Sequence, residues 1–310
     1  MSHNPFTADA AIAARIADVL PKIGAQISAA IGKVLHASND PGLNRGGVIE
    51  KPDVDRLIAA FSLTGVEDLM LLALGAAREI AHPPISDFHV GAVGLEAGTG
   101  NLVLGGNVEF PGTHLGTTVH GEGFVFTRAF SRGTSIRTIA IGEAHPCAHC
   151  RQYLSEFAAT RELTLIDPLG HRLTMAQLYP WPFDPDYLGE TGAVPNKKHW
   201  TLTADDLLLR EAGERAHTPY SKCPGAVVLT LRDGSRVRGS AIESVAFNPT
   251  MGPLQAALID LIAHGRSYGE IVSAKLGTVI GGAVDYAAST GELLGKVAPR
   301  ATLEVINWAP

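Results

Sequence analysis

Two short motifs carry side chains that bind zinc, at a spacing typical of a catalytic metal site. The first is HGE at residues 120–122, and the second is PCAHC at residues 146–150. Two thiolates three residues apart at the start of a helix can bind one zinc ion, and an imidazole from another helix start can complete a set of three ligands. The fourth position then stays open for water, which distinguishes catalytic from structural zinc. The predicted ligands are His120, Cys147 and Cys150.

Glu122 is the predicted proton carrier of this site. It lies two positions after His120, where its carboxylate can exchange protons with a water molecule whose pKa the zinc has lowered, without binding the metal itself. Other interpretations of these residues stay open. A CxxC pair alone is often a redox pair, and a lone histidine is more often a satisfied core or surface residue. The occurrence of both motifs together favours the metal site.

The composition narrows the classes of protein to which the chain can belong. With 45% hydrophobic and 18% charged residues among 310, it is predicted to fold around a sizeable core. A net charge of -6 argues against a nucleic-acid binder, because that affinity rests mainly on lysine and arginine. Three cysteines do not suit a disulfide framework, and no secretory signal or apolar run of about 20 residues is present. We expect a cytoplasmic protein without a membrane span that acts on a small molecule.

Hydrophobic patterning predicts strands that alternate with helices in the first half of the chain. Segment 64–81 has the pattern of a buried helix that begins with a capping box of Thr64 and Glu67. Predicted strands begin at Val90, Leu102, Thr138 and Leu163, and predicted helices begin near His120 and Pro146. This order is typical of an α/β fold with helices on both faces of a sheet, a three-layer α/β/α sandwich. Before it, apolar residues at helical spacing, interrupted by Pro21, predict two helices.

An internal repeat relates segments 90–110 and 224–244. Matched residues are separated by 134 positions, which indicates a duplicated domain; chance matching of glycines in two hairpins is the alternative. The pairs are Gly91 with Gly225, Gly105 with Gly239, and Glu109 with Glu243. We predict a helical N-terminal extension at 1–55, a catalytic domain at 56–190 and a second copy at 191–310, with a linker at 184–198.

The second copy lacks the predicted zinc ligands. At the same separation of 134, Leu254, Gln255 and Ala256 take the places of His120, Gly121 and Glu122, and no cysteine lies near Gly281. We therefore expect this copy to be a non-catalytic partner that packs on the first.

These motifs resemble those of the zinc-dependent cytidine deaminases, and closely those of the large homodimeric bacterial class. The segments that carry the resemblance are SDFHVGA, GGNVEF, TVHGE, PCAHCRQ, HTPYSK and AFNPT. Members of that class have a helical N-terminal extension, a catalytic domain and a degenerate copy of it. The resemblance therefore implies a duplicated sandwich of the cytidine deaminase type. It also implies a homodimer in which the aromatic segment 179–183 closes the site of the partner subunit.

The resemblance also assigns a role to each site residue. It makes the three predicted ligands the holders of one Zn²⁺ per subunit, with Glu122 as the proton shuttle. It places Asn107 and Glu109 on the ribose hydroxyls and Phe88 against the base. An amide offers a donor and an acceptor, a carboxylate accepts, and an aromatic ring stacks on a pyrimidine. Without these roles, Asn107 would be a turn residue, Glu109 a solvated charge and Phe88 a core residue.

The predicted reaction is hydrolytic deamination of cytidine, and of deoxycytidine, by zinc-activated water, which releases ammonia. The alternatives are a deaminase of a modified or different nucleoside and a nucleoside-binding pseudoenzyme. Departures from the family pattern at Ile85, His89, Gly121 and His145 keep both open. We expect the larger His145 and the missing methyl of Gly121 to reshape the space around the exocyclic amino group.

Overall fold

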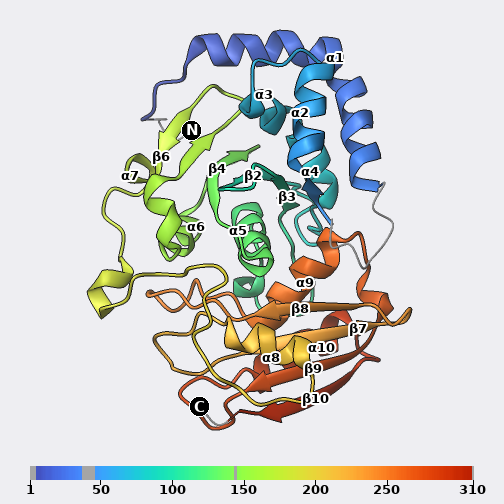
Figure 1. Ribbon diagram of the computed structural model, residues 1–310, viewed down its shortest axis with the longest axis vertical. Coiled ribbons are helices and arrows are strands. Elements are labelled where there is room, and N and C mark those ends of the chain that lie inside the picture. The colour runs from blue at the N-terminus through green and yellow to red at the C-terminus, as the bar shows by residue number, and fades with distance from the viewer. Residues whose placement is uncertain (1–4, 37–45, 143–144, 309–310) are drawn as a thin grey trace.

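A computed structural model of the protein is described for residues 5–36, 46–142 and 145–308. It contains two β-sheets, one from each half of the chain, with helices packed on them (Figure 1). The two sheets lie toward opposite ends of the molecule, and helices α5 and α9 lie between them (Figure 1). The predicted α/β fold is confirmed.

The first sheet has six strands in the order β1-β3-β2-β4-β5-β6. Strands β2 and β3 form an antiparallel hairpin, whereas β4 and β5 are parallel, so the ends of β4 and β5 meet at the same edge. The strands are β1 (Val48–Ile49), β2 (Gly91–Glu96), β3 (Leu102–Gly106), β4 (Ile136–Ile141), β5 (Thr164–Ile166) and β6 (Arg172–Thr174). The segments that follow β4 and β5 are therefore neighbours in space.

Helices cover both faces of this sheet. Because side chains alternate along a strand, Val103 of β3 faces α5, while Leu102 and Leu104 face the N-terminal helices. The helices are α1 (Ala10–His36), α2 (Lys51–Ala60), α3 (Val66–Leu72), α4 (Leu74–Ile80), α5 (Gly121–Arg132), α6 (Ala148–Ser155) and α7 (Met175–Leu178). The predicted three-layer arrangement is present. No helix among the described residues is long and apolar enough to cross a bilayer.

The N-terminal segment is one helix, which corrects the prediction of two. Helix α1 includes Pro21 and changes direction along its length (Figure 1). Proline lacks an N–H group and clashes with the preceding turn, which bends a helix without having to end it. Ile27 and Ile31 are fully buried in the apolar cluster that includes residues of α3 and α4, and this burial holds the second part in place. Helix α2 runs across residues 55 and 56, so the predicted boundary there falls within a helix.

Segment 64–81 forms two short helices, α3 and α4, which meet at Ala73. The predicted capping box is absent. The Thr64 hydroxyl instead donates to Asp68 at 2.6 Å, and Glu67 accepts a hydrogen bond from Arg172 on β6. The capping box would have given Glu67 a partner at the start of its own helix. In the structure its partner is instead the charged guanidinium group of Arg172.

The second sheet has four strands in the order β10-β9-β7-β8. Its strands are β7 (Ala226–Leu231), β8 (Arg236–Ser240), β9 (Ile271–Thr278) and β10 (Thr302–Asn307), and its helices are α8 (Leu207–Glu214), α9 (Pro253–Ala263) and α10 (Ala287–Val297). The β7–β8 hairpin and the antiparallel β9 repeat the arrangement of β2, β3 and β4. The chain therefore contains the same unit twice.

The structure corrects the alignment of the two copies. The bridge between Val108 and Val119 is repeated by the bridge between Ile242 and Met251, so the loop before α9 is two residues shorter than the loop before α5. Helix α9 consequently begins earlier than the constant separation predicted. Gly252, Pro253 and Leu254 take the places of His120, Gly121 and Glu122, rather than Leu254, Gln255 and Ala256. The second copy still lacks the histidine and the glutamate.

Buried polar contacts join the two copies. Arg128 of α5 forms an ion pair of 2.6 Å with Asp260 of α9. Glu156, which is fully buried after α6, accepts hydrogen bonds at 2.7 and 2.8 Å from His217 and Tyr220 of the second copy. Removing one partner from a buried charged pair is costly. The second copy is thus packed firmly against the elements that carry the predicted site.

Candidate metal centre and active site

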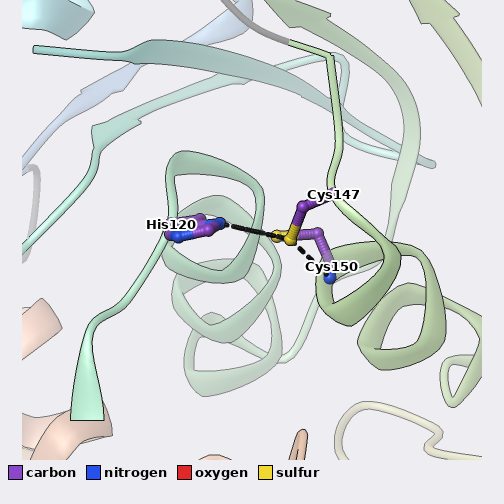
Figure 2. A group of neighbouring side chains, drawn as sticks. All are labelled: His120, Cys147 and Cys150. Carbon is purple, nitrogen blue, oxygen red and sulfur yellow. Dashed lines mark hydrogen bonds between the residues drawn. The ribbon is translucent and has the colours of Figure 1, made fainter. Parts of the chain in front are cut away.

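The three predicted zinc ligands lie together at the starts of two helices (Figure 2). His120 immediately precedes α5, Cys147 immediately precedes α6, and Cys150 lies in the first turn of α6. His120 Nδ1 is 3.5 Å from Cys147 Sγ and 3.2 Å from Cys150 Sγ. The two sulfur atoms are 3.6 Å apart. Side chains that are nearly thirty residues apart in the sequence thus converge on one point.

This donor set fits zinc. Ligands around a tetrahedral zinc ion lie about 3.5 to 3.8 Å apart when the Zn–N and Zn–S bonds have their usual lengths. Contact with Cys150 and His120 lowers the pKa of the Cys147 thiol, while contact with Cys147 and burial raise the pKa of the Cys150 thiol. Neighbouring thiols of this kind do not both ionise readily, and a divalent cation would stabilise both as thiolates. His120, Cys147 and Cys150 are the residues that would hold it.

Glu122 lies in the first turn of α5, two residues after the predicted ligand His120. Its side chain is buried, and burial raises the pKa of its carboxyl, against the effect of the neighbouring His120. A carboxyl group whose pKa is raised holds a proton more readily, which suits a group that must accept a proton and then deliver it. The site therefore places a proton carrier beside the predicted metal ligands.

Glu109 and Asn107 follow β3 and hold the segment that contains Phe88. Both Glu109 oxygens accept hydrogen bonds, at 2.6 Å from the Ser86 hydroxyl and at 2.8 Å from the Ile85 N–H. Burial opposes ionisation of Glu109, but these hydrogen bonds keep the net pKa of its carboxyl below the ordinary value. Asn107 accepts a hydrogen bond from the N–H of Val90 and donates one to the Phe88 carbonyl. Ser86 was not among the residues selected from the sequence.

The Phe88 ring is 53% exposed, so it is not a core residue. Near the start of α6, the His149 ring lies 3.4 Å from the Asn248 carbonyl oxygen, which brings a loop of the second copy to the edge of the same site. In segment 179–183 the Trp181 ring is 82% exposed and contacts Tyr187 of the same chain. The structure thus leaves two aromatic surfaces uncovered within one chain.

Two of the departures from the family pattern have structural explanations. The His145 ring is directed to Asp167, with 2.9 Å between Nε2 and Oδ2. A methyl group added at Gly121 would lie 3.1 Å from Cβ of Ala92 on β2. We expected these two residues to shape the space around the substrate amino group. In the structure His145 is directed to Asp167, and the open side of Gly121 faces Ala92. Nothing in the structure explains Ile85.

Comparisons with known proteins identify the same regions. Residues 64–165 and residues 180–290 each match a family model of the cytidine and deoxycytidylate deaminase zinc-binding region. The first match contains all three ligands and Glu122, and the second covers most of the second copy. Two separate matches in one chain confirm the duplication.

Full-length relatives match across both copies. A cytidine deaminase of Shewanella halifaxensis is 35% identical over 75% of this chain and 80% of its own length. A cytidine deaminase of Shewanella pealeana is 33% identical over 81% of this chain and 86% of its own length. Among solved structures, the cytidine deaminase from Mycobacterium leprae is 30% identical over 37% of this chain and 98% of its own, with a TM-score of 0.33.

Proposed function

Because this chain belongs to the cytidine and deoxycytidylate deaminase family of zinc enzymes, we propose that it deaminates cytidine, and deoxycytidine, by hydrolysis. The observation that carries the proposal is the convergence of His120, Cys147 and Cys150 beside the buried Glu122. Three zinc ligands alone would also be consistent with a structural metal site, and a buried carboxyl group alone would also be consistent with a purely structural role in the core. Their combination supports hydrolysis, because hydrolysis needs an activated water and a group that moves its protons.

The proposed reaction assigns the proton transfers to Glu122. When bound, zinc supplies Lewis-acid activation of the attacking water. The Glu122 carboxylate accepts a proton from that water and delivers it to the ring nitrogen of the pyrimidine, while the water oxygen bonds to the ring carbon that carries the amino group. Glu122 then takes the second proton from this oxygen and delivers it to the amino nitrogen, so that the carbon–nitrogen bond breaks and ammonia leaves. Burial raises the pKa of the Glu122 carboxyl, so the group holds an accepted proton more readily before delivering it to the substrate.

Substrate orientation is assigned to the segment that follows β3 and to Phe88. We place the pyrimidine against the exposed Phe88 ring and the ribose hydroxyls near Asn107 and Glu109. The low pKa of Glu109 keeps it ionised, so it can accept a hydrogen bond from a hydroxyl group. Three of the lone-pair positions of its carboxylate are used by Ser86 and Ile85, which leaves capacity for one more donor.

We further propose a cytoplasmic homodimer that acts in pyrimidine salvage. The exposed aromatic side chains of Trp181 and Tyr187 support a surface that a partner subunit covers. Within the chain we propose a helical extension at 1–55, a catalytic domain at 56–190 and a non-catalytic domain at 191–310. The two separate sheets support the division between the two copies, whereas α2 continues across the first boundary. The elution volume in size-exclusion chromatography coupled to light scattering tests the dimer, and limited proteolysis tests the boundaries.

The reaction is tested by mixing the purified protein with cytidine and following ammonia release together with the change in ultraviolet absorbance. Zinc is counted by elemental analysis of the same sample. We expect stoichiometric ammonia and pyrimidine product from a protein that carries zinc at His120, Cys147 and Cys150. Zinc-loaded protein that binds cytidine without releasing ammonia would instead indicate a pseudoenzyme, and release from a base-modified cytidine alone would indicate a different nucleoside.

A further inference from the structure

We propose that His145, Asp167 and His171 form a second divalent-metal site, which shares no ligand with the zinc centre. Asp167 Oδ2 lies 2.9 Å from His145 Nε2 and 2.6 Å from His171 Nδ1. Two imidazoles and one carboxylate form a ligand set that binds zinc and other first-row divalent cations. The group is the second of the two clusters of potential metal ligands found among the described residues.

The topology of the first sheet brings these residues together. Strands β4 and β5 are parallel neighbours, so the segments after them lie at the same edge of the sheet. His145 lies in the segment after β4, and Asp167 follows β5 directly. His171 is reached through the tight turn from β5 to β6, in which Gly170 has a φ of 90° that favours glycine. The site is thus built on strand ends rather than on a long loop.

The acidic ligand is held in position. Asp167 Oδ1 accepts hydrogen bonds of 2.9 Å from the N–H groups of Leu169 and His171, which directs Oδ2 toward the two imidazoles. Asp167 and His171 are both buried, whereas the side chain of His145 is 38% exposed. A ligand whose second oxygen is fixed by backbone donors is a recurring feature of metal sites. The exposed His145 gives a cation a route of entry.

The ligand atoms require only a small adjustment. Nitrogen and oxygen ligands of a tetrahedral zinc ion lie about 3.3 Å apart when bond lengths are normal. The contact of Asp167 with His145 is shorter than this by about 0.4 Å, and its contact with His171 by about 0.7 Å. Movement of the half-exposed His145 ring can supply the first difference, and a shift of the buried His171 ring must supply the second. The His145 and His171 rings lie 5.5 Å apart between centroids at an angle of 65°, so their nitrogens can approach one ion without stacking.

Two consequences follow from the ligand set and its location. The set contains no thiolate, so its affinity for zinc should be lower than that of the centre with two cysteines. An ion in the second site would also tie the segment before Cys147 to the β5–β6 turn. We therefore expect it to be filled after the first site, and to make the start of α6 more rigid when filled.

The experiment is a zinc titration of the holoenzyme by equilibrium dialysis, with metal measured by elemental analysis. We expect a first equivalent per chain that is retained at low free zinc and a second that binds as free zinc increases. The His145→Gln and Asp167→Asn variants should retain the first equivalent and lose the second. His114→Gln, which removes an exposed histidine elsewhere on the catalytic copy, is the matched control and should bind both.

Cobalt distinguishes the two sites and separates this proposal from the proposed function. Only the first site should give a thiolate-to-cobalt charge-transfer band, and Cys147→Ala should lose this band yet still bind one cobalt through nitrogen and oxygen ligands. Saturation at one equivalent per chain would overturn the second site. A second equivalent that persists unchanged in both His145→Gln and Asp167→Asn would overturn it as well, because the ion would then lie elsewhere.

Discussion

The two copies of the α/β unit share a hydrogen-bonded frame and differ in the side chains that this frame presents. In the first copy Glu109 accepts hydrogen bonds from the hydroxyl and N–H of Ser86. In the second copy Glu243 accepts the same two hydrogen bonds from Ser221. A carboxylate cradle that persists in a copy without metal ligands stabilises the fold. In the catalytic copy, the substrate binding that we propose for Glu109 would be an additional use of this structural element.

The residues assigned to chemistry are among those that differ between the two copies. Gly252, Leu254, Ala241 and Tyr286 take the places of His120, Glu122, Asn107 and Cys147. The Tyr286 ring also packs against Gly225, where an added Cβ would lie 2.5 Å from it. Apolar and aromatic groups thus occupy the second copy where the first has polar ligands. The comparison predicts that substitutions in the first copy affect turnover, and that those in the second affect stability.

Removing a ligand should have the largest effect. We expect Cys147→Ala to lose bound zinc and nearly all turnover, because His120 and Cys150 alone hold the ion poorly. Part of the stability should be lost with the metal, since binding energy contributes to folding. Elemental analysis and thermal unfolding measure the two effects. Normal zinc content in this variant would show that other residues bind the metal.

Glu122→Gln should abolish most turnover while the metal remains. The amide cannot accept the proton of the attacking water, so kcat should fall by about 10²- to 10⁴-fold, the usual contribution of general acid–base catalysis. Zinc content should equal that of the unmodified protein, because Glu122 is not a ligand. Loss of zinc together with activity would contradict the separation of roles within the catalytic copy.

The zinc ligands and the succession of strands and helices around them could be predicted, because each ligand lies at a helix start that is visible in the local sequence. The alignment of the copies could not, because the loop before α9 shortens by two residues without altering the hairpin that precedes it. The partners of Glu67 and His145 were also hidden. Glu67 pairs with Arg172, and His145 pairs with Asp167. Both partners are distant in the sequence, and such pairs leave no periodic signal in the chain.

The shared cradle gives the most direct comparison between the copies. Glu109→Gln should raise the KM for cytidine by roughly 10- to 150-fold, if the carboxylate makes one charge-assisted hydrogen bond to the substrate. Glu243→Gln should leave KM and kcat nearly unchanged, because its cradle faces no zinc ligands. Both variants should lower the unfolding midpoint, since each weakens the hydrogen bonds from a serine. Equal changes in KM would show that the second copy also contacts the substrate.

Leu254 provides the test with the smallest expected effect on turnover. It is 2% exposed at the start of α9, in the position that Glu122 occupies at the start of α5. Leu254→Ala should lower the free energy of unfolding by about 2 to 5 kcal/mol, because truncation removes buried contacts and leaves a cavity. Once folded, the variant should retain kcat, since this residue lies in the copy without ligands.

Leu254→Met is the matched control, because a side chain of similar volume should cost less than about 1.5 kcal/mol. Urea unfolding followed by fluorescence measures the stability of both variants, and turnover is measured well below the unfolding transition. A Leu254→Ala protein as stable as the unmodified chain but catalytically inactive would reverse the comparison. The second copy would then position groups in the active site, and its contact with α5 would transmit the defect.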